Sequence, residues 1–204
     1  MFMSTVYAPA QTLELPAPQI TGGATLAEAL SQRHSVREFD PTRVVTFQVL
    51  SNMLWSAVGI NRSDTGMRTN PTALNTQEID VYCFMERGIY LYDPKNNCLK
   101  LKAEGDHRGL IAGTKAFSQD FVYDAPVSLL FVADLARFET PSERNESMAT
   151  LDAGIACENL LLYCSAARMA SVPRVTMDTA GIAKVLGLPT TALPLINVPV
   201  GYAK

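Results

Sequence analysis

The hydrophobic residues near the start of the chain follow the spacing of an α-helix in two places. Over residues 25–32 and again over 46–58, apolar side chains recur every three or four positions and so share one helix face. Thr25, with Glu28 three residues later, has the pattern of a capping box, which begins a helix. Gly59 follows the second pattern and predicts its end.

The longest helical pattern covers residues 143–170. Most of its faces are apolar between residues 155 and 167, which predicts a helix buried in a core or between subunits. Asp178 is a suitable cap for a shorter helix that extends to about residue 186. Residues 106–121 are expected to form one or two short helices.

Alternating or continuously apolar runs predict the strands. The expected strands are residues 78–85, 89–92, 98–102, 126–133, 171–176 and 195–200. The first three are joined by short turns and predict a meander. The run at 126–133 is apolar throughout and is typical of a central strand buried on both faces. Because strands and helices alternate irregularly, the pattern favours an α+β fold over repeated βαβ units.

Residues 1–24 follow neither the helical nor the strand period, and they carry three prolines and a Gly-Gly pair. They are therefore expected to be an extended arm on a surface. The domain is expected to cover residues 25–204. Short stretches within the first ten residues also resemble the end of an export signal. A cytoplasmic protein with an irregular start and a protein exported to the periplasm therefore both remain open. Residues 61–75 are polar and aperiodic and predict a long loop, a kind that is often functional.

Composition narrows the function classes. The chain has 204 residues, of which 48% are hydrophobic and 18% charged, and this balance excludes a disordered or fibrous protein. Its net charge of −3 argues against binding nucleic acid through bulk positive charge. No apolar run approaches the length of about 20 residues that a membrane helix needs. The four cysteines form no Cys-x-x-Cys pair and are expected to be reduced and packed.

Self-contained active-site motifs are absent from the sequence. It has no Gly-x-Ser-x-Gly hydrolase elbow, no phosphate-binding P-loop and no Gly-x-Gly-x-x-Gly fingerprint. Only two histidines are present, His34 and His107, which excludes a zinc site built from several histidines. If the protein is an enzyme, we therefore expect a cofactor to carry the chemistry, with no catalytic side chain and no metal.

The most informative segment is Arg33-His34-Ser35-Val36-Arg37, which follows the first helix. In an extended chain, Arg33, Ser35 and Arg37 point to the same side and His34 to the other. Two guanidinium groups and a hydroxyl suit a phosphate. The alternative is a solvated basic turn in which an arginine pairs with Glu38 or Asp40.

Residues 33–40, Arg-His-Ser-Val-Arg-Glu-Phe-Asp, resemble the opening motif of the nitroreductase family of FMN-dependent oxidoreductases. The resemblance implies that Arg33 and Ser35 bind the FMN phosphate and that His34 lies along the ribityl chain. It places Arg37 near N1 and O2 of the flavin ring. A cation there stabilises the negative charge that two-electron reduction puts on the ring.

A second segment, Pro71-Thr72-Ala73-Leu74-Asn75-Thr76-Gln77, is similar to the family's Pro-Ser-x-x-Asn-x-Gln segment. By resemblance it reaches across a dimer interface to the FMN of the other subunit. Asn75 carries a donor and an acceptor, which suits N3–H and O4 of the ring, although without the family a turn residue is the simpler interpretation. The family's proline after the glutamine is Glu78 here.

A third, weaker similarity joins the long helix to the segment Val172-Pro173-Arg174-Val175. In the family, backbone N–H groups of this segment lie near flavin N5. Arg174 either adds charge to the site or is an ordinary strand-end arginine. The chain closes with Gly201-Tyr202-Ala203-Lys204, where Lys204 is a further candidate for the phosphate that its own carboxylate would oppose.

The resemblance as a whole implies an α+β fold with a mixed, mostly antiparallel sheet flanked by helices, a long central helix and an intertwined homodimer. The implied function is an FMN-dependent flavoprotein oxidoreductase that passes hydride from NADH or NADPH to a nitroaromatic, quinone or other electron-poor acceptor by a ping-pong mechanism. Alternatives are a different flavin reaction, such as dehydrogenation or dehalogenation of a small metabolite, and a non-catalytic flavin-binding module. The candidate cofactor-binding residues are Arg33, His34, Ser35, Arg37, Pro71, Thr72, Ala73, Leu74, Asn75, Gln77, Pro173, Arg174 and Lys204.

Overall fold

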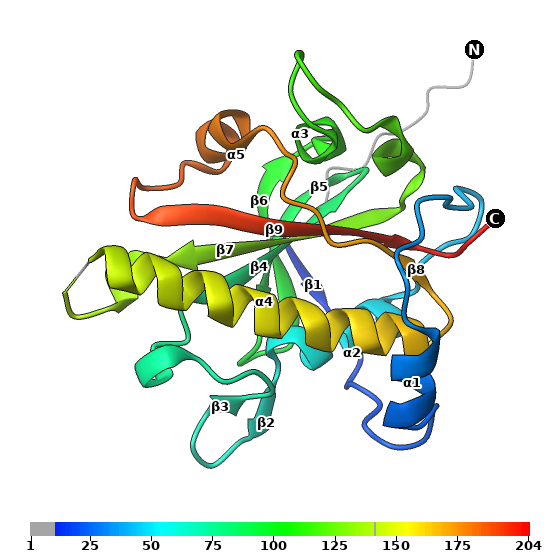
Figure 1. Cartoon of the computed structure of the whole chain (residues 1–204), viewed down its shortest axis with the longest axis horizontal. Coiled ribbons are helices and arrows are strands. Elements are labelled where there is room, and N and C mark those ends of the chain that lie inside the picture. Colours follow the sequence, from blue (N-terminus) through cyan, green and yellow to red (C-terminus); the bar gives the residue numbers. More distant parts are fainter. Residues whose placement is uncertain (1–10, 141) are drawn as a thin grey trace.

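The computed structural model describes residues 11–140 and 142–204. Its centre is a seven-stranded sheet in the order β1-β6-β5-β4-β7-β9-β8, with helices on both faces (Figure 1). The strands are β1 (Thr12–Glu14), β4 (Ile79–Met85), β5 (Gly88–Asp93), β6 (Cys98–Glu104), β7 (Val127–Asp134), β8 (Ala170–Ser171) and β9 (Ala192–Gly201). The expected α+β architecture with a mostly antiparallel sheet is confirmed.

Five α-helices and three short 3₁₀ helices accompany the sheet in the described residues. The α-helices are α1 (Leu26–Gln32), α2 (Phe47–Val58), α3 (Arg108–Ala112), α4 (Glu143–Ala166) and α5 (Thr179–Leu186). The 3₁₀ helices are η1 (Ala73–Asn75), η2 (Asp120–Asp124) and η3 (Leu135–Arg137). None of the helices described is long and apolar enough to cross a membrane.

Two hydrophobic clusters cover the two faces of the sheet. On one face, α2 and α4 pack against the sheet in a cluster that includes Leu54 of α2, Leu160 of α4 and Phe131 of β7. On the other, α3 and α5 pack over a smaller cluster that includes Phe84 and Ile182. Because β7 lies between these layers, its residues have to be apolar on both sides, and Leu129 to Phe131 are fully buried. The prediction of a central buried strand is confirmed.

The helix signals in the sequence also act as expected. Thr25 and Glu28 form the predicted capping box at the start of α1, and the Asp178 side chain caps α5. Gly59 ends α2 with extended rather than left-handed backbone. A Cβ at this position would lie 2.4 Å from the Trp55 ring, so the glycine is needed there for space.

Three predicted elements have different bounds in the structure. The long helix ends at Ala166 rather than 170, because Arg168 turns left-handed at φ 54° and the Met169 N–H then bonds back to Cys164 O. The expected strand 171–176 shrinks to β8 and a single bridge between Arg174 and Asn197. Strand β9 begins at Ala192, before Pro194, rather than at residue 195.

The two segments predicted as irregular contain local structure. The loop at 61–75 includes a small hairpin of β2 (Ile60–Arg62) and β3 (Met67–Arg68), and it ends in η1. Within the predicted arm, β1 pairs with β6 at the edge of the sheet, so this part of the arm lies on its own chain. The possible export signal concerns residues 1–10, which lie outside the described residues.

Candidate functional site

The first candidate segment is held along the edge of the sheet. Helix α1 stops at Arg33, whose backbone is extended. The Val36 N–H then donates to Ser171 O of β8 at 3.0 Å. Phe39 is fully buried and bridges to Ala203. The backbone of residues 33–39 is therefore fixed at both ends, which gives its polar side chains a defined direction.

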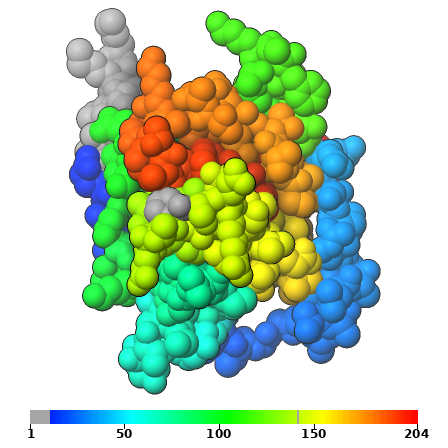
Figure 2. Space-filling view, turned by 60° about the vertical axis from the view of Figure 1, so that its left-hand side comes forward, coloured from blue at the N-terminus to red at the C-terminus, as the bar shows by residue number. Residues whose placement is uncertain are grey.

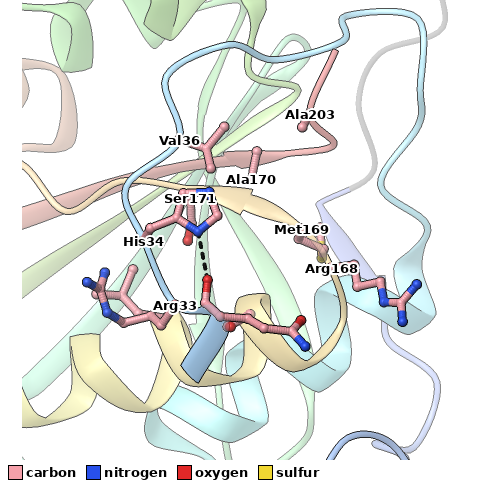
Figure 3. Close-up of a pocket in the computed structure, with 11 residues that line it drawn as sticks. Arg33, His34, Val36, Arg168, Met169, Ala170, Ser171 and Ala203 are labelled. Atoms are coloured by element: carbon pink, nitrogen blue, oxygen red, sulfur yellow. Dashed lines mark hydrogen bonds between the residues drawn. The ribbon is translucent and has the colours of Figure 1, made fainter. Parts of the chain in front are cut away.

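Behind this segment lies a cavity of about 220 Å³, between the segment and the C-terminal end of α4 (Figure 3). Arg33, His34 and Val36 line the cavity, whereas Ser35 and Arg37 do not. The His34 ring Nδ1 lies 2.7 Å from Gln32 O. The alternation expected of an extended chain is thus present from His34 to Arg37, but the prediction is wrong for Arg33, which lines the cavity with His34 because it still caps the end of α1. The cavity is smaller than the roughly 300–1,000 Å³ of whole-ligand pockets, so it suits a small group.

The arginines of this segment have no acidic partners. Among residues 11–140 and 142–204, no ion pair involves Arg33 or Arg37. Asp40 instead accepts hydrogen bonds from Thr42, which lower its carboxyl pKa. The basic turn neutralised by Glu38 or Asp40 is therefore not what the structure contains. Uncompensated guanidinium groups beside an exposed hydroxyl fit the phosphate of FMN.

Arg174 has a structural role in the interior. Its guanidinium donates to Gln119 Oε1, Asn197 Oδ1 and the backbone carbonyls of Ile111 and Ala112, at 2.6–3.1 Å. Burial, together with the positive charge of Arg37, lowers its pKa to about 10. The side chain ties α3 to the sheet, and a contact with a cofactor stays a prediction.

The other C-terminal candidates are placed differently. Lys204 Nζ pairs with Asp124 at 3.1 Å on the surface. Pro173 is exposed between buried Val172 and buried Arg174, and the next residue, Val175, is 75% exposed. The Arg174 N–H already donates to Asn197 O, so in this short segment it is not free for a ligand.

The second candidate segment, residues 71–77, is strained. Leu74, Asn75 and Gln77 all have left-handed backbone, with φ of 56°, 54° and 51°. Such conformations cost about 1 kcal/mol or more each in residues other than glycine and tend to gather at functional sites. Leu74 and Asn75 are exposed at the tip. The segment thus presents its predicted contact residue, Asn75, to the outside.

Several side chains distant in sequence hold this strained loop. Asp152 of α4 accepts a hydrogen bond from the Ala73 N–H at 2.7 Å. Arg137 donates to Gln77 O at 2.7 Å and pairs with Asp80. The sequence pattern does not single out Asp152 or Arg137. In the sequence they stand out only as charged residues, and no neighbouring motif links them to a loop some 60 to 80 positions away.

The two candidate segments contact different parts of α4. The loop is tied to Asp152, whereas Ser165 Oγ donates to Ala29 O of α1, just before the first segment. At 1.5 Å per residue, these anchor points are roughly 20 Å apart along the helix. Figure 2 shows the loop region beside the start of α4. One chain therefore does not bring the two segments into one site.

Comparisons with known proteins agree with the motifs. The model of the nitroreductase family matches residues 30–202. The crystal structure of a candidate nitroreductase from Ralstonia eutropha JMP134 is 35% identical to this chain, with a TM-score of 0.86, over 96% of this chain and 90% of that one. No curated protein matches the chain.

More distant solved structures share the fold alone. A candidate nitroreductase from Anabaena variabilis is 19% identical with a TM-score of 0.75, over 95% of this chain and 42% of that one. A candidate NADH oxidase from Clostridium acetobutylicum is 16% identical with a TM-score of 0.61, over 86% and 87%. The family match and the 35% identity show that this chain belongs to the nitroreductase family of oxidoreductases.

Proposed function

We propose that this protein is an FMN-dependent oxidoreductase that takes hydride from NADH or NADPH and reduces nitroaromatic, quinone or other electron-poor acceptors in two separate half-reactions. The observation that carries the proposal is the pair of arginines on the 33–37 segment, which is fixed to the sheet edge but has no acidic partner in the described chain. Bound FMN would supply the hydride transfer between donor and acceptor.

Each polar residue of the first segment would contact a different part of the cofactor. Arg33 and Ser35 would bind the phosphate, since a guanidinium and a hydroxyl are matched donors for its oxygens. His34 would lie beside the ribityl chain. Arg37 would place a fixed positive charge near N1 and O2 and so stabilise the reduced form. Val175, two residues after Pro173, is exposed, and its backbone N–H is the donor of this segment that we assign to N5.

The second segment would complete the site from another subunit. Asn75 would pair with N3–H and O4 of the partner's flavin, because its amide offers both an acceptor and a donor. The roughly 20 Å between the segments along α4 requires a second copy for this contact. Leu151 and Ile155 of α4 are 68% and 41% exposed. An apolar helix face of this kind supports a homodimer with FMN at its interface.

The proposal is tested by adding NADH or NADPH to the FMN-loaded protein without oxygen and following flavin absorbance. We expect bleaching by the nucleotide and recovery of colour when a quinone or a nitroaromatic is added. Arg33→Ala is expected to weaken FMN binding about tenfold, or about 1.4 kcal/mol. The matched control is Lys102→Ala, an exposed cation on β6. Tightly bound FMN that neither nucleotide reduces would contradict the proposed reaction.

A further inference from the structure

A pair of buried carboxyl groups lies under the strained loop 71–77. Glu78 is fully buried and directly follows the loop, at the position where the family pattern has proline. Asp152 of α4 is 7% exposed and accepts the Ala73 N–H. The Glu78 side chain accepts a hydrogen bond from Thr76 at 2.6 Å. Both acids therefore contact the loop from the protein interior, Asp152 at the start of η1 and Glu78 just after its end.

The two carboxyl groups also meet each other. Burial raises the pKa of Glu78 and outweighs the hydrogen bond from Thr76, which lowers it, and both a hydrogen bond with Asp152 and the charge of Asp152 raise it further. Two carboxylates in contact inside a protein do not both stay ionised, because neither can donate a hydrogen bond to the other. One shared proton removes the repulsion and supplies the missing donor.

The surroundings offset a second negative charge only in part, through the charge of one buried arginine that acts on Glu78. The nearby cation is Arg68 of β3, whose guanidinium donates to Ile79 O and makes no ion pair among the described residues. Asp80 and Arg137, which also act on Arg68, pair with each other. In the described chain, Arg68 Nε, Asn70 Oδ1 and Glu78 Oε1 are buried without hydrogen-bond partners. Buried polar atoms without hydrogen-bond partners are energetically costly, so a change of one proton in this cluster has a large effect.

We propose that Glu78 and Asp152 share one proton and together act as a latch that holds loop 71–77 in its left-handed conformation, with Asn75 presented to the flavin of the other subunit. The two acids are positioning residues, since the loop stands between them and the ligand. The inference deepens the proposed function and rests on it for the identity of the ligand. The contacts of the latch lie within one chain and can be tested without the ligand.

The sign of the pH dependence follows from the raised pKa of Glu78. The stabilisation is complete at low pH and is lost as the pH rises through the folded-state pKa. Above it, two negative charges repel each other beneath the loop, and the Ala73 N–H loses its fixed acceptor. Once the open loop predominates, each further pH unit should weaken FMN binding about tenfold.

Glu78→Gln removes the titration and keeps the shape. The glutamine amide can donate to Asp152 and its oxygen can accept from Thr76, as the protonated acid does. We expect the wild-type FMN dissociation constant to rise between about pH 5 and pH 9, and that of Glu78→Gln to stay near the low-pH wild-type value. Glu86→Gln, an exposed acid at the β4–β5 turn, should keep the wild-type profile. Identical profiles for Glu78→Gln and wild type would overturn the latch.

A second measurement does not depend on flavin. In the FMN-free protein, the protection of the Ala73 amide against hydrogen exchange, corrected for the intrinsic pH effect, should fall about tenfold or more over the same range. In Glu78→Gln it should stay constant. Constant protection in the wild type overturns the latch even if the protein binds FMN. Falling protection in a protein that does not bind FMN supports the latch and refutes the proposed function.

Discussion

Arg37 is the residue whose charge matters most for the proposed chemistry. It is exposed, has no acidic partner in the described chain and lies near enough to Arg174 to contribute to the lowered pKa of that guanidinium, after burial. We expect Arg37→Ala to weaken FMN binding about tenfold and to lower the two-electron reduction potential by about 30 mV, equivalent to 1.4 kcal/mol. Spectroscopic titration against a reference dye measures both. Lys102→Ala is the control, and an unchanged potential would contradict the role of Arg37.

Arg174 is expected to act on stability. Arg174→Leu leaves the carbonyls of Ile111 and Ala112 and the side chain of Asn197 without their donor. Because buried acceptors lose their partners, we expect a loss of about 3 kcal/mol in the free energy of unfolding, measured by urea denaturation. Lys100→Ala, which breaks an exposed pair, should cost about 0.5 kcal/mol or less. Equal effects of the two changes would contradict the interior role.

The four cysteines give a chemical test of the core. All are buried and free, and burial raises the pKa of the Cys157 and Cys164 thiols to about 12. Since only the thiolate reacts, we expect no labelling by Ellman's reagent in the native protein at neutral pH and full labelling in denaturant. Rapid labelling of the native protein would show that the helix α4 is not packed as described.

The C-terminal end of α4 carries a testable strain. Arg168 is left-handed, a conformation that glycine adopts without cost. Arg168→Gly should therefore raise the free energy of unfolding by about 0.5–1 kcal/mol. Ala167→Gly, at a neighbouring position with negative φ, should lower it by a similar amount, because glycine there only adds freedom to the unfolded chain. Thermal unfolding of both variants checks the prediction, and destabilisation by both would contradict it.

Helices and strands whose own residues repeat with a helical or strand period could be predicted from the sequence. Elements that form only because they pair with a distant segment could not. The meander β4-β5-β6, the buried β7 and the capped α1 follow from alternation and capping residues that lie within each element. The three residues of β1 form a strand only because β6 is beside them. In the candidate site, too, the local motifs could be predicted and the distant residues that hold them could not. The motifs at 33–37 and 71–77 are local, whereas Asp152 and Ser171, which hold them, come from segments about 80 and 135 positions away.

The molecule as a whole is expected to work as a dimer. We expect Leu151→Arg, on the exposed face of α4, to give a monomer that also loses FMN, because a buried unpaired charge opposes association and the proposed site needs Asn75 from the other subunit. Sedimentation measures the mass. Val44→Arg, on an exposed apolar residue outside α4, should remain dimeric. A Leu151→Arg protein that stays dimeric and keeps FMN would contradict the proposed interface.

The central claim is that the chain holds FMN at the 33–37 segment. The most direct test is to add FMN to the purified protein, remove free ligand by desalting and record the visible absorption spectrum beside that of Arg33→Ala. We expect a yellow protein with about one FMN per chain, and a variant that retains much less. A colourless wild-type protein, or equal retention by the variant, would contradict it.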